Sequence, residues 1–398
     1  MSHAFGRAFT LGVEEELLLL DAGTLELEPA VERVVPEPTE RLKTELFACL
    51  AETTTGICES ADEVLGELRA LRDELAQRAE PLGVVVAASG AHPFGRGAGQ
   101  RIVEGPVYRK MQASLGEAIY RQLVCGLHVH VGMPGPEACL RAFEGVLPWL
   151  PVLLSMSANS PYLEGSAGPP SGRAQRLAEL PRAEAPPGFG SWEEFETFAG
   201  QPDFNRMWWD ARPHPGYGTL EVRIADQQTD VRRSAGFAAL VQALAATAAD
   251  GEGAPEPYDR ALYARRRAGA ALASPDPRDV RRLAALVEPT ARRLGGWGLV
   301  VELLAGPPEC ERQLQVGRAE GSEPSRRTSS SARIYDPARW RCKPTRFTSP
   351  ASAASGASRG SQPLSRGRTG WRAQTPTSWA RCSSPGTTRR RRRTLCSR

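Results

Sequence analysis

The sequence predicts an α+β protein whose antiparallel sheet leaves one polar face open and carries helices on the other. Three strand-length segments place acids, histidines or an arginine at every second position, with apolar residues between them. Side chains of a strand alternate between its two faces, so each segment has one apolar and one polar face. An antiparallel sheet commonly packs one face on a core and leaves the other in water. Long segments with helical spacing supply the covering layer.

The first strand is expected at residues 12–17, which read GVEEEL. Glu14 and Glu16 share one face of this strand, whereas Glu15 lies with the apolar residues on the other. Further strands repeat the pattern of one apolar and one polar face. Their polar positions are His128 and His130 in residues 127–132, Glu221 and Arg223 in residues 219–226, and Glu52 in the candidate strand 49–55.

Helical spacing and start signals place the remaining elements. Ser60 or Asp62 can cap a first helix, and Ser191 a second. Proline and glycine are so frequent in residues 165–190 that we expect no regular structure there. Helices are expected at residues 62–80, 192–198, 235–249 and 276–294, and further strands at residues 84–88, 123–131 and 207–209.

The end of the chain differs in kind from the rest. Residues 321–398 hold 18 of the 50 Lys and Arg residues but two of the 46 Asp and Glu residues, so the body is acidic although the chain carries +4. This segment contains no valine and ends in five arginines at 389–393, so it cannot build a core. We expect a folded domain at 1–320 and a disordered Arg/Ser/Pro-rich tail. The abrupt change of composition favours a frameshifted translation of GC-rich DNA. The alternatives are an arm for nucleic acid or a membrane surface, and a natural tail with no specific task.

Several classes of protein are excluded by pattern. The longest apolar run, residues 145–158, is shorter than the roughly 20 residues that a membrane span needs. The eight cysteines form no CxxC pair, so a zinc site of the usual spacing is not expected, and scattered cysteines fit a reducing cytoplasm. No P-loop, GxGxxG or HExxH motif occurs. We expect a cytoplasmic protein with no membrane partner and no specific nucleic-acid partner.

The polar face has a definite chemistry. Carboxylates that share a face repel one another unless a cation lies among them. Carboxylate oxygens suit Mg²⁺, which prefers to share its coordination sphere with phosphate, so the face fits a Mg–nucleotide platform. Each element alone has a plainer explanation: a solvated acidic run, a hydrogen-bonded histidine pair in the core, or a salt-bridged strand. Their occurrence together favours a functional site.

The order of these segments resembles the glutamate–cysteine ligase type 2, or carboxylate–amine ligase, family over about residues 9–320. The resemblance stops where the basic tail begins. It rests on GVEEE (12–16), ELF and ET (45–47, 52–53), SGAHPF (89–94), LVCGLHVHVGMP (123–134), SANSPYLEG (157–165), WWDARP (208–213), GTLEVRIADQQT (218–229) and RQLQVGRAEG (312–321).

The resemblance implies a fold similar to the catalytic domain of glutamine synthetase, with a curved antiparallel sheet whose open face holds Mg²⁺ and ATP. It implies a ligase that forms an amide through an acyl phosphate, with glutamate and cysteine as the expected substrates and a homodimer as a possible assembly. The implied metal ligands are Glu14, Glu16, Glu52, His128 and Glu221, the implied catalytic residues are Arg223 and His130, and the implied substrate-binding residues are Arg173 and Asn159.

Of the two histidines, His128 is expected closer to the metal, and His130 is expected to hold phosphate or a neighbouring carboxylate. One segment departs from the family: SAGPPSGRAQ at 166–175 keeps a Ser-x-Arg at Ser171 and Arg173 but lacks the usual aspartate and Gly-Tyr pair. Two alternatives stay open. One is a metal-dependent hydrolase that uses the two histidines, and the other is a non-enzymatic binding protein that acts through the basic tail.

Overall fold

One antiparallel sheet lies at the centre of the fold. The computed structural model describes residues 4–202, 204–252 and 257–319, so the expected tail lies outside the described residues. Within these ranges, seven strands form one antiparallel sheet in the order β2-β3-β1-β5-β9-β8, and β4 pairs with the C-terminal half of β1. The strands are β1 (Leu11–Asp21), β2 (Leu42–Thr44), β3 (Leu50–Thr54), β4 (Val84–Ala87), β5 (Gly126–Gly132), β8 (Ala211–His214) and β9 (Thr219–Asp226), with a separate small pair β6 (Tyr162–Leu163) and β7 (Ser166–Ala167).

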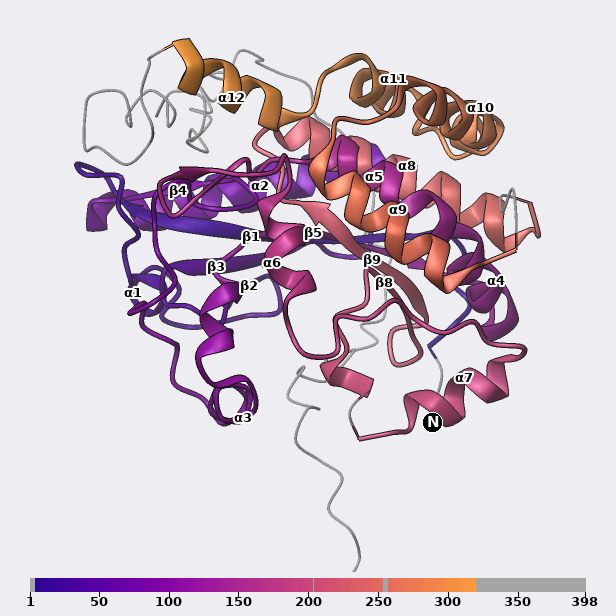
Figure 1. Ribbon diagram of the computed structural model, residues 1–398, viewed down its shortest axis with the longest axis horizontal. Coiled ribbons are helices and arrows are strands. Elements are labelled where there is room, and N and C mark those ends of the chain that lie inside the picture. Colours follow the sequence, from indigo (N-terminus) through magenta and orange to yellow (C-terminus); the bar gives the residue numbers. More distant parts are fainter. Residues whose placement is uncertain (1–3, 203, 253–256, 320–398) are drawn as a thin grey trace, which may run out of the picture. The chain divides into compact units, whose positions relative to one another are not determined.

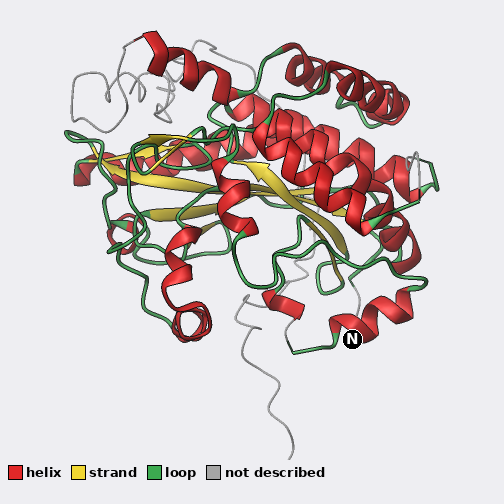
Figure 2. Cartoon of the chain, viewed as in Figure 1, coloured by secondary structure: helices red, strands yellow, loops and turns green. Residues whose placement is uncertain are grey.

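Helices form the second layer, and Figure 2 shows them around the central strands. Four 3-10 segments lie among the described helices: η1 (Glu80–Leu82), η2 (Gly116–Gln122), η3 (Leu147–Trp149) and η4 (Phe204–Arg206). The α-helices are α1 (Val31–Val34), α2 (Ala61–Ala79), α3 (Pro106–Leu115), α4 (Pro136–Val146), α5 (Leu150–Ser157), α6 (Gly172–Ala178), α7 (Trp192–Ala199), α8 (Val231–Ala249), α9 (Arg260–Leu272), α10 (Pro277–Arg293), α11 (Trp297–Ala305) and α12 (Glu309–Ala319).

The helix α8 lies at the centre of the covering layer. It contacts α2, α4, α10, α11 and the sheet strand β5, and Figure 1 shows α8, α10 and α11 on the same side of the strands. Its alanine-rich sequence allows this close packing, and nearly every residue after Arg233 is buried. The apolar faces of β1, β5 and β9 pack into the same core through residues such as Val13, Val129 and Val222. The predicted fold class is therefore confirmed.

The predicted helices are confirmed as α2, α7, α8 and α10, with ends that differ by at most four residues. Two of the expected N-caps are also present. The Oγ atoms of Ser60 and Ser191 each accept a hydrogen bond from a backbone N–H three residues later, at Glu63 and Glu194. The strands expected at 84–88 and 123–131 are β4 and β5, and β5 begins three residues later than predicted.

Two local predictions are wrong. Residues 207–209 form no strand, and the strand of this region, β8, begins at Ala211. The apolar pattern there reflects ring packing, because Trp209 is buried and stacks on Phe198 with 5.5 Å between ring centroids. Residues 165–190 are not wholly irregular, because the helix α6 forms within them, where the Oγ atom of Ser171 accepts a hydrogen bond from the first turn.

One helical run among the described residues passes a length and composition test for a membrane span. It extends from Pro136 to Ser157 through α4, η3 and α5, and 78% of its most apolar stretch is buried inside the fold. A buried core helix passes the same test, so the run is weak evidence for a span.

The buried imidazole of His92 makes a specific prediction about acid stability. Its Nε2 atom lies 2.9 Å from the carbonyl oxygen of Leu25, and its Nδ1 atom lies 2.6 Å from the backbone nitrogen of Gly95. The carbonyl can only accept and the amide can only donate, so the neutral ring carries its proton on Nε2. Burial lowers the pKa of His92 to about 4, although the bond to Leu25 opposes this shift.

The unfolded chain binds this proton near pH 6.5, so the stabilising effect of neutral His92 is complete above that pH and is lost as pH falls toward 4. Between pH 7 and pH 4.5 the wild type should lose roughly 2–3 kcal/mol more unfolding free energy than His92→Asn. The asparagine keeps a nearby acceptor but does not titrate. Urea denaturation of both proteins at the two pH values measures the difference, and parallel losses would contradict the prediction.

Candidate functional site

The register of the sheet brings the predicted polar residues together on one face. Glu14 on β1 stands directly opposite His128 on β5, and Glu16 stands opposite Glu52 on β3. His130 on β5 stands opposite Glu221 on β9. Directly opposed residues of an antiparallel pair have Cβ atoms about 5 Å apart, so antiparallel pairing itself assembles the cluster. The side chains come from four strands that lie far apart in the sequence.

Glu14, His130 and Glu221 form the centre of this cluster. Each offers one ligand atom, and the three atoms lie within 4.8 Å of one another. Two carboxylate oxygens and one imidazole nitrogen are a donor set that suits a divalent cation. On the other side of Glu14, its Oε2 atom lies 3.3 Å from Nδ1 of His128. Burial raises the pKa of Glu14, but the bond to His128 and the nearby charges of His130 and Lys43 lower it to about 2.

The two histidines take different places on the polar face, and their expected roles toward metal and phosphate stay predictions. His130 belongs to the group of three, and its Nε2 atom lies 3.7 Å from Oε1 of Glu221 and 3.9 Å from Oε1 of Glu14. His128 stands next to Glu14 and Glu16, on the outer side of that group. Burial and the charge of Arg223 lower the pKa of His128, so this ring is neutral at pH 7. Of the two histidines, His130 therefore lies within the group of three potential ligands.

Two arginines hold the carboxylate of Glu221. Arg212 on β8 donates hydrogen bonds to Oε2 at 2.9 and 3.2 Å, and Arg223 pairs with Oε1. Burial raises the pKa of Glu221, but the two guanidinium groups outweigh burial and hold it well below the usual range. Arg212 was not anticipated from sequence, because it lies in WWDARP, where two tryptophans and a proline hide the alternation. Its pairing with Glu221 follows from the β8–β9 register.

Lys43 and Glu45 are further residues of this face that the sequence did not reveal. The Nζ atom of Lys43 lies 2.6 Å from Oε1 of Glu52 and 2.9 Å from Oγ1 of Thr54. Burial and the charge of Glu14 raise the pKa of Glu52 to about 7, although Lys43 opposes the shift. Burial and the charges of Glu16 and Glu52 raise the pKa of Glu45 to about 8. Several carboxylates compete here for few cations, as expected at a cation-binding face.

Arg173 approaches the other end of this face. The carboxylate of Glu16 accepts a hydrogen bond from the backbone nitrogen of Gly126 at 2.5 Å. A Cβ atom at Gly126 would collide with the Arg173 guanidinium and the His128 ring, so glycine permits this close approach. The guanidinium of Arg173 donates to the carbonyl oxygens of Ile224 and Arg223. Its buried Nε atom has no hydrogen-bond partner among the described residues. A substrate role for Arg173 stays a prediction.

Asn159 lies behind the site in a buried hydrogen-bond network. Its Nδ2 atom donates to the carbonyl oxygen of Gln227 and to Oγ1 of Thr229, and its Oδ1 atom accepts from Gln313. The backbone nitrogen of Asn159 donates to the carboxylate of Asp226, at the end of β9. These bonds fix the end of β9, and the expected substrate contact of Asn159 stays a prediction.

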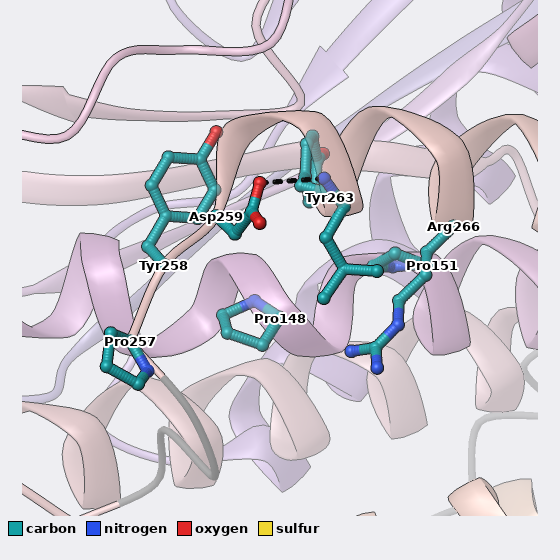
Figure 3. A pocket seen from close by; sticks show the side chains of 8 residues that line it. Pro148, Pro151, Pro257, Tyr258, Asp259, Tyr263 and Arg266 are labelled. Carbon is teal, nitrogen blue, oxygen red and sulfur yellow. Dashed lines mark hydrogen bonds between the residues drawn. The ribbon is translucent and has the colours of Figure 1, made fainter.

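A hollow lies where the start of α9 meets η3 and α5 (Figure 3). Its polar groups serve the fold. Asp259 caps α9 by accepting hydrogen bonds from two backbone N–H groups, and the hydroxyl of Tyr263 donates to Asp210. We assign no chemistry to this hollow. Its lining residues are Pro148, Pro151, Pro257, Tyr258, Asp259, Leu262, Tyr263 and Arg266.

Comparisons with known proteins give the site its context. A family model described as "Glutamate-cysteine ligase family 2 (GCS2)" matches residues 10–285. The chain is 36% identical over 340 residues to "Putative glutamate--cysteine ligase 2-2" of Rubrobacter xylanophilus, covering 79% of this chain and 88% of that one. It is 34% identical over 350 residues to a glutamate–cysteine ligase of Natronomonas pharaonis, covering 80% and 94%.

A solved structure supports the fold. The crystal structure of a glutamate–cysteine ligase from Francisella tularensis in complex with AMP superimposes with a TM-score of 0.57. It covers 85% of this chain and 90% of that one at 13% sequence identity. At this identity the likeness shows a shared fold, and the shared fold agrees with the antiparallel sheet described above.

The fold and its family relationship define an ATP-dependent carboxylate–amine ligase. Within that class, the chain belongs to the glutamate–cysteine ligase family 2. The resemblance seen in the sequence is therefore confirmed. The hydrolase alternative finds no support in the family, and the alternative of a binding protein that acts through its tail concerns residues outside the described ranges.

Proposed function

We propose that this chain joins the γ-carboxylate of glutamate to the amine of cysteine, with ATP and Mg²⁺. The observation that carries the proposal is the group of Glu14, His130 and Glu221, next to two arginines on one sheet face, in a member of this family. Carboxylate and imidazole donors fit Mg²⁺, and the arginines supply fixed positive charge for phosphate oxygens. The names of relatives point to glutamate and cysteine as substrates.

The proposed reaction has two steps. An oxygen of the substrate carboxylate attacks the γ-phosphorus of ATP, the bond to the β-phosphate oxygen breaks, and ADP leaves. The amine nitrogen then attacks the acyl carbon of the acyl phosphate, the C–N bond forms, phosphate leaves, and the amine gives up a proton. Such transfer depends mainly on positioning and on charge stabilisation, so no nucleophilic side chain is required.

The residues of the chain divide these tasks. Glu14, His130 and Glu221 would hold Mg²⁺, which when bound neutralises phosphate charge. Arg223 lies against Glu221 and would stabilise the charge that develops on the transferred phosphoryl group. The neutral imidazole of His128 can hold Glu14 in place by a hydrogen bond. Glu16 and Glu52 surround this group as further candidate ligands.

The domain, the substrates, the location and the assembly of the protein belong to the same proposal. We propose that residues 1–320 form the catalytic domain, that the substrates are small molecules, that the protein works in the cytoplasm, and that it forms a homodimer. Arg173 would contact a substrate carboxylate, because its guanidinium reaches the polar face next to His128.

An isotope experiment tests the reaction. The full chain is incubated with Mg²⁺–ATP, cysteine and glutamate labelled with ¹⁸O in its γ-carboxylate. Through an acyl phosphate, one labelled oxygen should move into the released phosphate. Release of ADP without label in phosphate would contradict the acyl phosphate. Screening ADP release over other carboxylates and amines tests the substrates, and no ATP consumption with any pair would contradict the proposed function.

A further inference from the structure

The residue before β8, Asp210, adjoins an arginine of the candidate site. In the register of β8 with β9, Ala211 stands opposite Val222. The backbone nitrogen of Arg223 donates to the carbonyl oxygen of Asp210 at 2.7 Å, so the backbone pairing continues one residue further. Asp210 therefore stands across from Arg223, the arginine that pairs with Glu221.

Two side chains of α9 occupy the carboxylate of Asp210. The Nε and Nη2 atoms of Arg267 donate to Oδ2 and Oδ1 at 2.5 and 2.9 Å, and the hydroxyl of Tyr263 donates to Oδ2 at 2.6 Å. Asp210 is 9% exposed, so this pair is largely shielded from water. Bidentate pairs of arginine with a carboxylate are among the strong charge-assisted hydrogen bonds. The charge of Asp210 is therefore compensated by a helix, although the adjoining strand pair carries two arginines of its own.

Those two arginines serve a different carboxylate. Arg212 follows Asp210 by two residues, and Arg223 stands across from it, yet both pair with Glu221. A buried carboxylate that lacks a counter-charge attracts the cations next to it, because their interaction is strong at low dielectric. Without the cation of α9, Asp210 would compete with Glu221 for Arg212 and Arg223.

We propose that Arg267 is a positioning residue for the reaction: it holds the carboxylate of Asp210 on α9 and so keeps Arg223 directed at Glu221 and the transferred phosphoryl group. The inference rests on the proposed function, because it takes Arg223 as the residue that stabilises phosphoryl charge. Arg267 acts through Asp210 and does not itself contact the group of Glu14, His130 and Glu221. It gives the helix α9 a task in catalysis.

Kinetics of ADP release by the full chain, with calorimetry of Mg²⁺–ADP binding, tests the inference. Arg267→Met removes the charge, and kcat should fall about 10- to 100-fold. The Kd for ADP should change less than about threefold, because ADP lacks the transferred phosphoryl group. Adding Asp210→Asn removes the competing carboxylate and should restore kcat to within about threefold of the wild type. Arg266→Met is the matched control, because Arg266 is the next residue of α9 and is exposed.

The outcomes separate positioning from support of the fold. Rates are measured well below each melting temperature, with folding checked by circular dichroism, because Arg267→Met also leaves a buried carboxylate unpaired. A wild-type kcat in folded Arg267→Met, or a double variant as slow as the single one, would overturn the role of Arg267 and leave the proposed function standing.

A second neutral variant covers the case in which Arg267→Met does not fold. Arg267→Gln keeps a hydrogen-bond donor for Asp210 and should show the same fall in kcat, and an unchanged kcat would overturn the inference. A wild type that releases no ADP from ATP with any substrate pair would overturn the proposed function, and the inference with it.

Discussion

Replacing Glu14 by glutamine should lower Mg²⁺–ATP-dependent ADP release by roughly 10³-fold while the protein stays folded. Glu14 belongs to the candidate metal group and also contacts His128 and Lys43, so it is the carboxylate that links both halves of the polar face. Glutamine keeps the size and shape of the side chain but offers no negative charge to a divalent cation. The loss should therefore fall on catalysis and on the Mg²⁺ requirement.

The variant should fold because the apolar side of β1 is unchanged. Some stability should be lost, since the cationic neighbours that hold the pKa of Glu14 low also stabilise its charged form in the native state. Rates measured over a range of Mg²⁺ concentrations, with melting curves for each protein, separate the two effects. Glu117→Gln is the control, because Glu117 is exposed in η2. Activity within about 10-fold of wild type would remove Glu14 from the metal group.

Strand alternation was enough to predict the heart of this site. Glu14, Glu16, His128, His130 and Glu221 each lie on the predicted polar side, because a period of two is fixed by strand geometry. Register is not fixed by the pattern within a single strand. The pattern therefore could not tell that His130, rather than His128, would join Glu14 and Glu221.

Other residues of the site lacked a readable local signal. Lys43 lies in the three-residue strand β2, which is too short to show alternation. Asn159 lies in the loop after α5, and Arg173 lies in the first turn of the short helix α6. The positions of both side chains depend on hydrogen bonds to distant carbonyl groups, such as that of Ile224 for Arg173. The strand wrongly expected at 207–209 also shows that a local apolar pattern does not determine backbone pairing. The apolar side chains there are buried by packing of aromatic rings, and the backbone forms no strand.

A buried ion pair under the sheet should carry the largest effect on stability. Replacing Arg72 by methionine should lower the unfolding free energy by about 3–5 kcal/mol. Arg72 lies on α2 and Glu15 on β1, and both side chains are almost fully buried. The guanidinium donates to both carboxylate oxygens of Glu15, at 2.7 and 2.5 Å.

The same guanidinium also links α2 and β1 to the segment that follows β9. It donates to the backbone carbonyl oxygens of Gln228 and Thr229, which follow β9, at 2.9 and 2.8 Å. Glu15 accepts further hydrogen bonds from the side chains of Gln227 and Ser234. Glu15 lies between Glu14 and Glu16 on β1, so this network fixes the strand that presents the polar face. Methionine fills much of the space of arginine but leaves the carboxylate and both carbonyl groups without that donor.

The expected loss of unfolding free energy arises because Arg72→Met leaves the carboxylate of Glu15 buried without its counter-charge. A carboxylate buried without a counter-charge must stay charged at low dielectric or take up a proton, and both alternatives destabilise the native state. Adding Glu15→Gln to Arg72→Met should restore part of the loss, because the remaining hydrogen bonds need no charge. Arg78→Met on the same helix breaks an exposed pair with Glu74 and should cost less than about 0.5 kcal/mol. Urea denaturation of the four proteins measures these differences, and a loss below about 1 kcal/mol for Arg72→Met would show that the pair does not stabilise the sheet.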